Sequence, residues 1–137
     1  MNVHARNRGF TLIELLIVMV IASVLAMIAV PSYQASVIKS RRADGRVVLN
    51  DTAQRLERCY TQFGAYDAAD CAIADGEEIA SGEGFYLLTV AVPDAATYTL
   101  TAVPQGPQAD DAECGELALT NTGARAITGD GELERCW

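Results

Sequence analysis

An almost unbroken run of apolar residues from Phe10 to Val30 constrains this chain most. Glu14 is the only charged side chain in the run, and Pro31 follows it directly. A helix rises about 1.5 Å per residue, so about 21 residues make a helix of roughly 30 Å, the thickness of the hydrocarbon core of a bilayer. The sequence therefore predicts a helix that lies in lipid or among other apolar helices.

A secretory signal peptide is the first alternative explanation of the run. It needs a shorter apolar core followed by a small-x-small cleavage site, whereas Val24-Leu25-Ala26 is a degenerate match inside the run. A plain single-pass anchor is the second alternative, and it accounts for Arg6 and Arg8, which the positive-inside rule keeps in the cytoplasm. It leaves Glu14 unexplained, because an acidic residue in a spanning helix costs about 2.5–3.5 kcal/mol.

The formal charge of −8 is divided unevenly along the chain. Residues 1–59 hold eight Lys or Arg and four acids, a net of +4, whereas residues 60–137 hold two Arg and fourteen acids, a net of −12. Binding of nucleic acid needs clustered cations, so the acidic second half argues against nucleic acid as a partner. With the first arginines in the cytoplasm, this half faces an oxidising compartment.

The four cysteines, Cys59, Cys71, Cys114 and Cys136, all lie beyond the apolar run. An even number of cysteines in a small exported domain is typical of disulfides. Three pairings exist in principle, and we favour Cys59–Cys71 with Cys114–Cys136 because both close short loops, each worth on the order of 3 kcal/mol in the chain-entropy model. Zinc is not expected, since neither pair has Cys-x-x-Cys spacing and the one histidine, His4, precedes the run.

A second helical pattern follows Pro31. Its predicted apolar seam has steps of four and three residues and consists of Leu49, Ala53, Leu56, Tyr60 and Phe63. Pro31 is therefore expected to kink one long helix rather than to divide two, and Gly45 weakens the second half by about 1 kcal/mol relative to alanine. An equally compatible interpretation is that Pro31 and Gly45 mark simple bends.

The composition changes after the helical pattern. Gly, Ala and Asp dominate residues 64–84, which indicates an exposed connecting loop. Phe85–Val92 is rich in β-forming residues, and Thr97–Val103 alternates as a half-buried strand should. The side chains of this second strand that we expect to face the helix are Tyr98, Leu100 and Ala102.

Two further segments complete a small antiparallel sheet. Glu116–Thr120 and Ala124–Ile127 flank Asn121-Thr122-Gly123, which is a turn of the hairpin type. One long helix laid across this sheet predicts an α+β fold.

The stretch Arg8-Gly9-Phe10-Thr11-Leu12-Ile13-Glu14-Leu15-Leu16 resembles the class III signal of type IV pilins. The resemblance implies that a prepilin peptidase cuts after Gly9 and methylates the new N-terminal residue, Phe10. In a helical bundle the ammonium of Phe10 needs an opposite charge, which Glu14 of a neighbouring subunit would supply at one axial stagger. Phe10, Glu14 and Pro31 are accordingly the expected assembly residues.

The C-terminal part extends the resemblance. Residues 98–106, residues 114–125 and the final Cys136-Trp137 look like minor pilins of the PilE-like group. In that group Cys114–Cys136 would enclose the disulfide-bounded region near the pilin C-terminus. The extra pair Cys59–Cys71 separates this chain from typical major pilins.

The resemblance implies the type IV pilin fold, in which one long N-terminal helix packs on a small antiparallel β-sheet. The expected parts are a leader (1–9), a hydrophobic transmembrane and assembly helix (10–31), its amphipathic continuation (32–63) and a globular head (64–137). The head would contain the connecting loop, the sheet and the disulfide-bounded C-terminal region.

The implied function is that of a minor pilin in a type IV pilus, which supports pilus assembly, adhesion, twitching motility or DNA uptake. The chain would cross the inner membrane once before assembly and lie in the extracellular pilus afterwards. Its partners would be other pilin subunits, the prepilin peptidase and an inner-membrane assembly platform.

Two alternatives stay open. A pseudopilin of a type II secretion system shares the signal and the helix, but the main pseudopilin characteristically lacks such disulfides. A membrane-anchored binding module, such as a receptor for incoming DNA, is opposed by the net charge of −12 over residues 60–137.

No catalytic residues, cofactor or metal are expected, and the chain is not expected to be an enzyme. Glu57, Asp67 and Asp70 are scattered carboxylates on an acidic head, not an acid/base pair. The cluster Asp110, Asp111 and Glu113 leaves an irregular calcium site as an alternative, although its spacing does not fit an EF-hand.

Four cations of the second helical half were also considered as a set: Lys39, Arg41, Arg42 and Arg46. We expect them on a solvated face, with the acidic heads of neighbouring subunits or lipid head groups as alternative partners.

Overall fold

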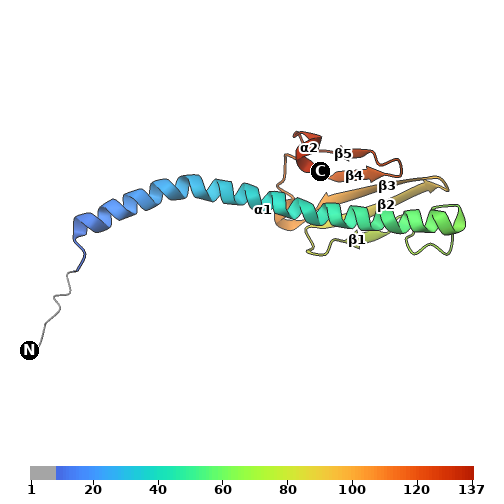
Figure 1. The fold of residues 1–137 in the computed structure, drawn as a ribbon, viewed down its shortest axis with the longest axis horizontal. Coiled ribbons are helices and arrows are strands. Elements are labelled where there is room, and N and C mark those ends of the chain that lie inside the picture. Colours follow the sequence, from blue (N-terminus) through green and yellow to red (C-terminus); the bar gives the residue numbers. More distant parts are fainter. Residues whose placement is uncertain (1–8) are drawn as a thin grey trace, which may run out of the picture. The chain divides into compact units, whose positions relative to one another are not determined.

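The computed structural model describes residues 9–137, so the expected leader lies outside the described residues except for Gly9. The chain divides into two units at Ser36 and Val37. Its elements are α1 (Leu12–Phe63), β1 (Glu78–Ala80), β2 (Tyr86–Asp94), β3 (Thr97–Pro104), the short 3-10 helix η1 (Gly106–Gln108), β4 (Leu117–Thr120), β5 (Arg125–Ile127) and α2 (Leu133–Cys136) (Figure 1).

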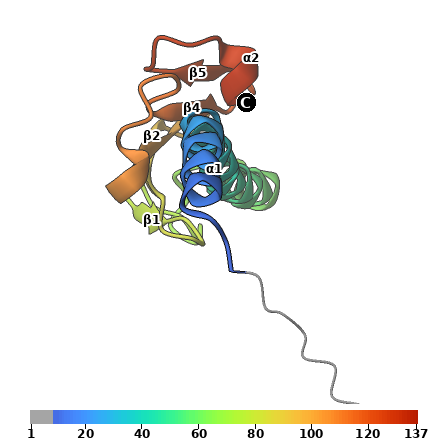
Figure 2. The ribbon, with the colours of Figure 1, turned by 90° about the vertical axis from the view of Figure 1, so that its left-hand side faces the viewer.

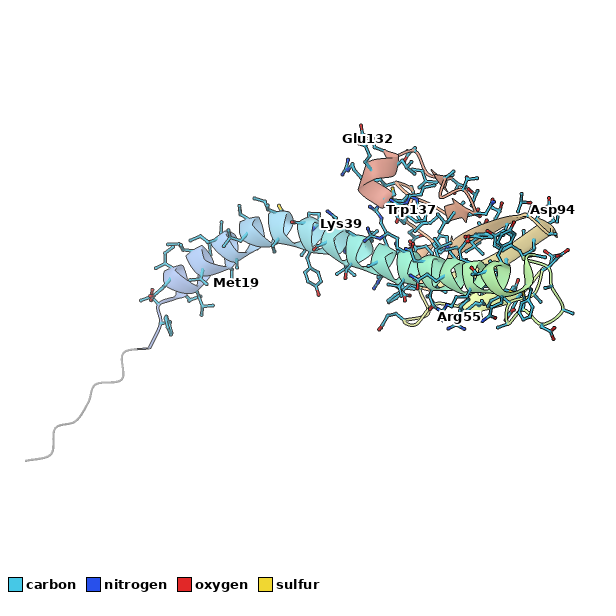
Figure 3. All side chains as sticks on the ribbon, turned by 45° about the vertical axis from the view of Figure 1, so that its right-hand side comes forward. Met19, Lys39, Arg55, Asp94, Glu132 and Trp137 are labelled. Atoms are coloured by element: carbon cyan, nitrogen blue, oxygen red, sulfur yellow. A yellow bond between two sulfur atoms is a disulfide. The ribbon has the colours of Figure 1, made fainter. Side chains whose placement is uncertain are left out.

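The first unit consists of the N-terminal part of α1 and the residues before it. Every described side chain from Gly9 to Ser36 is exposed, including Leu12 at 88% and Met19 at 65%. Figure 3 shows the side chains of this part, Met19 among them, standing out around the helix. The helix includes an apolar stretch long enough to cross a membrane, and none of that stretch is buried. A bare apolar surface of this size requires lipid or other helices to cover it.

The second unit is a five-stranded sheet with the rest of α1 laid across one face. The strands follow in the order β1-β2-β3-β4-β5, and every neighbouring pair is antiparallel. This order places β5, with α2 beside it, at one edge of the sheet and β1 at the other (Figures 1 and 2).

The core lies between α1 and the sheet because one side of each strand is apolar. Along β2 and β3 alternate residues are buried, so polar threonines of β3 point away from the helix. The buried side chains of the sheet are Tyr86, Leu88, Val90, Val92, Tyr98, Leu100, Ala102, Leu117 and Leu119. The helix presents Arg42, Gly45, Val48, Leu49, Thr52, Leu56 and Cys59.

Gly45 lets the helix approach the sheet closely. A Cβ at this position would lie 2.9 Å from Cγ and Cδ2 of the buried Tyr86 ring. The absence of a side chain at Gly45 therefore makes room for the largest fully buried side chain of the core. The residue is a packing requirement, which the sequence pattern alone presented only as a weak point or a bend.

The expected α+β fold with one long helix is confirmed. The strands expected from Phe85 to Val103 and the C-terminal hairpin are found within a few residues of their predicted ends. Tyr98, Leu100 and Ala102 face the core as expected.

Two expectations about this part of the chain were wrong, and one short helix was missed. Residues 64–84 are not only a loop, because β1 pairs with β2 through residues such as Ile79 opposite Leu88; three residues are too few to show an alternating pattern. The apolar seam of α1 does not extend to Tyr60 and Phe63, whose side chains are 41% and 48% exposed. The last buried residue on this helix is Cys59 instead. The short helix α2 was not predicted.

We predict that Gly45→Ala destabilises the head. The helix itself gains about 1 kcal/mol from alanine, but overpacking against Tyr86 costs about 1–3 kcal/mol, so a net loss of about 1 kcal/mol is expected. Urea unfolding of the full chain in detergent micelles, followed by Trp137 fluorescence, measures this. Ser40→Ala, on the exposed surface of α1, serves as control. An increase in stability with Gly45→Ala would show that Tyr86 moves aside freely.

Candidate assembly site

The residues at the start of α1 form an accessible segment. Gly9, Phe10 and Thr11 precede the helix without regular structure, and Phe10 is 83% exposed. The peptide bond between Gly9 and Phe10 thus lies in a non-helical, exposed stretch. A protease needs an extended segment of this kind, because helical backbone does not enter its active site.

Thr11 caps the helix, and Glu14 stands in the first turn. The backbone N–H of Glu14 donates to Oγ1 of Thr11 (3.3 Å), and the N–H of Leu15 donates to the carbonyl of Thr11 (3.2 Å). Thr-x-x-Glu at this place is the sequence of a capping box, and an acid here is also favoured by the helix dipole. The local role of Glu14 at the helix start was not recognised in the sequence, although the spacing from Thr11 signals it.

Pro31 lies inside α1 without ending it. The helix is assigned continuously from Leu12 to Phe63, so Pro31 does not divide two helices. Proline has no backbone N–H, so the helix lacks the hydrogen bond that this residue would donate to the carbonyl four residues earlier.

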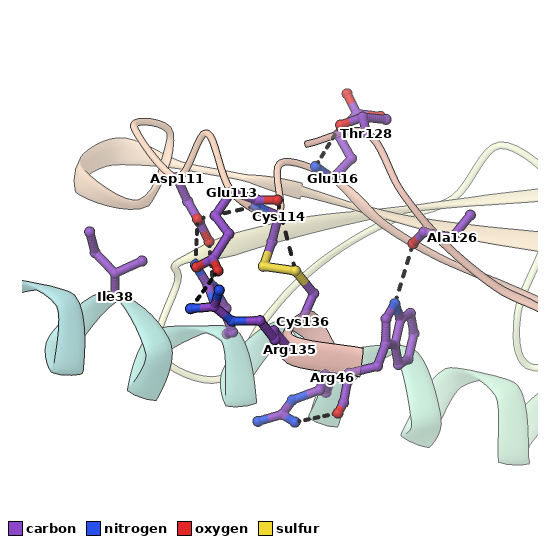
Figure 4. The surroundings of a disulfide bond; sticks show 12 residues. Ile38, Arg46, Asp111, Glu113, Cys114, Glu116, Ala126, Thr128, Arg135 and Cys136 are labelled. Carbon is purple, nitrogen blue, oxygen red and sulfur yellow. Dashed lines mark hydrogen bonds and ion pairs between the residues drawn. A yellow bond between two sulfur atoms is a disulfide. The ribbon is translucent and has the colours of Figure 1, made fainter. Parts of the chain in front are cut away.

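Two disulfides close the second unit. Cys114 and Cys136 are joined with Cα atoms 5.6 Å apart, and Cys59 and Cys71 with Cα atoms 5.5 Å apart. The Cys114–Cys136 disulfide encloses β4, β5 and most of α2, and it forms the expected disulfide-bounded region (Figure 4). The second ties the loop after α1 to the last turn of that helix.

Arg42 of α1 reaches into the disulfide-bounded region. Its Nε and Nη2 donate to the two carboxylate oxygens of Asp111 (2.7 Å each), and Nη2 also donates to Oε2 of Glu113 (2.7 Å). Arg42 is 5% exposed and Asp111 is 4% exposed. Arg135 of α2 pairs with the other oxygen of Glu113 at 3.0 Å (Figure 4).

The contact between Arg42 and the two carboxylates shifts the pKa of Arg42 and of Glu113 in the direction that favours their charged forms. The hydrogen bond to Asp111 raises the pKa of Arg42 further above its ordinary value. The hydrogen bond from Arg42 lowers the pKa of Glu113. A buried bidentate pair of this kind is costly to break, because either partner alone would be an uncompensated buried charge.

The buried side chain of Gln108 lies beside the ion pair of Arg42 and Asp111. Its Nε2 donates to Oδ2 of Asp111 (3.1 Å), to the hydroxyl of Tyr86 (3.2 Å) and to the carbonyl of Ile38 (3.4 Å). Burial raises the pKa of Tyr86 above its ordinary value. The same side chains thus connect the helix, β2 and the segment before β4.

The expectation that Arg42 lies on a solvated face was wrong. Arg42 stands one turn before Gly45 and two turns before Leu49, on the buried face of α1. The spacing of three and four residues that predicts the apolar seam also includes Arg42. Because arginine is charged, the sequence pattern was not extended to it. An arginine can occupy such a place only with carboxylates that come from elsewhere in the fold.

The carboxylates considered for catalysis or calcium have other partners or lie apart. Asp111 and Glu113 lie with Cys114 in one acidic group, but the guanidinium of Arg42 occupies the carboxylates and Cys114 is in a disulfide. Glu57 accepts hydrogen bonds from the hydroxyls of Tyr66 (2.9 Å) and Tyr98 (3.1 Å). Burial, aided by Glu57, raises the pKa of Tyr66 to about 12.

A long helix with an exposed apolar start, an antiparallel sheet across its second part and a disulfide-bounded C-terminal region are the features of the type IV pilin class. The model of the family described as "Type IV minor pilin ComP, DNA uptake sequence receptor" matches residues 31–118, and the prokaryotic N-terminal methylation motif matches residues 4–30. The chain belongs to this family of type IV minor pilins.

Two fimbrial proteins are similar in sequence to this chain. The fimbrial protein EcpC of Eikenella corrodens is 33% identical over 91 residues, which cover 66% of this chain and 58% of that protein. A fimbrial protein of Moraxella nonliquefaciens is 38% identical over 83 residues, covering 56% of this chain and 50% of the relative. The chain thus spans only about half the length of these relatives.

Two solved structures share the fold. A type IV pilin from Shewanella oneidensis is 28% identical with a TM-score of 0.50, covering 73% of this chain and 97% of the other. The non-core minor pilin PilV of Neisseria meningitidis, 23% identical with a TM-score of 0.53, covers 71% and 92% respectively and supports the fold alone.

We predict that Arg42→Met destabilises the chain by about 3–5 kcal/mol, because Asp111 would remain buried without its cation. Arg135→Met is the matched control: Arg135 is 68% exposed and its removal should cost less than about 1 kcal/mol. Urea unfolding of the full chain in micelles measures both. Equal effects of the two substitutions would contradict a structural role for the buried pair.

Proposed function

We propose that this minor pilin is made as a membrane-anchored precursor and built into a type IV pilus through the N-terminal part of α1. The observation that carries the proposal is the apolar surface from Phe10 to Val30, exposed on all sides and directly behind an accessible Gly9–Phe10 bond. This surface first lies in the inner membrane, with one pass, and later among the helices of other subunits in the extracellular filament.

Processing supplies the charge that assembly uses. A prepilin peptidase cuts after Gly9, and the new terminus at Phe10 is N-methylated and carries an ammonium. Glu14 lies at the other side of the first helical turn, where its carboxylate is exposed to a neighbour. The pairing of Glu14 with the ammonium of an adjacent subunit offsets two desolvation costs and sets the axial position of the subunit.

The role is structural rather than catalytic, and the partners are other pilin subunits and an inner-membrane assembly platform. The family match and the two disulfides favour a pilus over a type II secretion machine. Pilus assembly, adhesion, twitching motility and DNA uptake are the processes in which such a subunit acts.

DNA uptake is a second candidate for the head itself, since the description of the matching family names a DNA uptake sequence receptor. The charge of the chain opposes a broad affinity: Cys59 to Ala124 contains no Lys or Arg. Retardation of a DNA duplex by the full chain at low and high salt tests this candidate.

We predict that the chain recovered from sheared surface filaments begins at N-methylated Phe10. Mass spectrometry of the N-terminal peptide measures this, because removal of residues 1–9 and addition of one methyl group give a defined mass. A terminus beyond Ala26 would indicate ordinary signal cleavage, and absence of the chain from the filaments would refute the proposed function.

We predict that Glu14→Val permits membrane insertion but reduces incorporation into filaments. Glu14→Gln is the decisive control, because glutamine keeps the polar capping position and loses only the charge. Incorporation should fall with both substitutions, as judged by immunoblots of membranes and sheared filaments. If Glu14→Gln incorporates normally while Glu14→Val does not, helix capping rather than charge pairing is the role of Glu14.

A further inference from the structure

The two disulfides of the head differ in their access to solvent. Cys114 and Cys136 are both fully buried, with exposed fractions of 0%. Cys59 is 6% exposed, and Cys71 is partly exposed on the loop after α1. Thiol–disulfide exchange requires a thiolate to reach one of the two sulfurs, so access decides which bond reacts in the folded chain.

A small pocket opens beside the more accessible disulfide. Its volume is about 220 Å³, and both cysteines of the bond line it. Arg55 and Arg58 of α1 belong to the same lining, as does Asp70, which directly precedes Cys71. A pocket of this volume accommodates a molecule of a few heavy atoms, such as a small thiol.

The lining of the pocket carries more positive than negative charge. Arg55, labelled in Figure 3, pairs with Asp51 at 2.8 Å on the surface of α1. Nε of Arg58 donates to the backbone carbonyl of Gln54 (3.3 Å), and in the described part of the chain no carboxylate lies within ion-pair distance of this guanidinium. Because Asp70 is the one acid of the lining, the pocket attracts an anion although the head as a whole is acidic.

The neighbours of the two sulfurs also differ in charge. Cys59 directly follows Arg58 and stands one helical turn after Arg55, and nearby cations stabilise a thiolate. Cys71 directly follows Asp70, whose negative charge opposes a thiolate. Since the sulfur with the more stable thiolate leaves faster, Cys59 is the better leaving group, and the more exposed Cys71 is the sulfur that is attacked.

We propose that the Cys59–Cys71 disulfide is a site of reversible thiol–disulfide exchange with small anionic thiols, which enter the pocket and attack Cys71. In the first step a thiolate forms a bond to Sγ of Cys71, and the bond between the two cysteines breaks. Sγ of Cys59 leaves with the electron pair and takes up a proton from water.

A second thiolate completes the exchange. It attacks the sulfur of the reagent that is bound to Cys71, which releases a reagent disulfide and the thiolate of Cys71, and water protonates this thiolate. In the balance, two external thiols are oxidised to one disulfide, and the cystine is reduced to two cysteines.

The loop stays anchored after the disulfide opens. Tyr66 and Ile73, on either side of Cys71 in the sequence, are 5% and 4% exposed and belong to the apolar core. The backbone N–H of Tyr66 also donates to the carbonyl of Ala95 (2.9 Å). The open form is therefore a folded head with two thiols on its surface, whereas the buried Cys114–Cys136 bond stays closed.

Partial reduction of the folded full chain in detergent micelles tests the difference in access. The thiol is 2-mercaptoethanesulfonate, and alkylation at successive times followed by mass spectrometry of the peptides gives the rate for each disulfide. Cys59–Cys71 should open about tenfold faster than Cys114–Cys136, while the fluorescence of Trp137 stays that of the folded chain. Reagent trapped early as a mixed disulfide should be on Cys71.

Three results of this experiment would overturn the proposal. They are equal rates for the two bonds, no opening of either bond before the chain unfolds, and reagent trapped on Cys59 instead of Cys71.

Matched thiols and substitutions test the charge of the pocket. At low salt and equal thiolate concentration, 2-mercaptoethanesulfonate should open the Cys59–Cys71 bond about threefold faster than neutral 2-mercaptoethanol, the reverse of what the net charge of −8 favours. Arg58→Gln should abolish this preference, and Asp70→Asn should increase it. Lys39→Gln removes the same charge as Arg58→Gln from an exposed helix position outside the pocket and should leave the preference unchanged.

The outcomes separate access from charge. Selective opening of Cys59–Cys71 without a preference for the anionic thiol would overturn the pocket as the entry site, and so would a preference that Arg58→Gln and Lys39→Gln reduce equally. Incorporation into filaments is a separate measurement, so neither result bears on the proposed function.

Discussion

Helix α1 has to satisfy two different surroundings along its length, and the rest of the molecule follows from this constraint. Up to Val30 the helix is apolar on all sides, and no described part of the chain covers it. From Arg42 onward only one face is apolar, and the sheet covers that face. A surface of the first kind is stable only in lipid or among similar helices, so it calls for partners, whereas the second kind folds a head by itself.

The head is closed by a charged contact as well as by apolar packing. Arg42 leaves the helix to meet Asp111 and Glu113, and the Cys114–Cys136 disulfide holds the segment that carries these acids. A buried ion pair adds little net stability compared with apolar residues, but it tolerates only one alignment. It therefore fixes how the C-terminal region sits on the helix, which in turn places Trp137 beside Arg46 of α1.

The acidic side chains of the head serve different roles. Some of the acids are internal partners, such as Asp111 for Arg42 and Glu57 for Tyr66 and Tyr98. Others, such as Asp67 and Asp70, are exposed on the loop that the Cys59–Cys71 disulfide holds. The net charge alone does not distinguish the two groups, because it counts a buried, compensated carboxylate and an exposed one equally.

The sequence by itself determined the long helix, its apolar start with Glu14 and the strand segments of the sheet, because these depend on periodicity and on residue order within one segment. It also indicated the disulfide-bounded region through the spacing of Cys114 and Cys136. Only the tertiary structure decided that Arg42 is buried, that Gly45 accommodates Tyr86 and that β1 is a strand. The physical reason is the same in each case: the partner comes from a distant part of the chain, and no local pattern records a contact between residues that folding alone brings together.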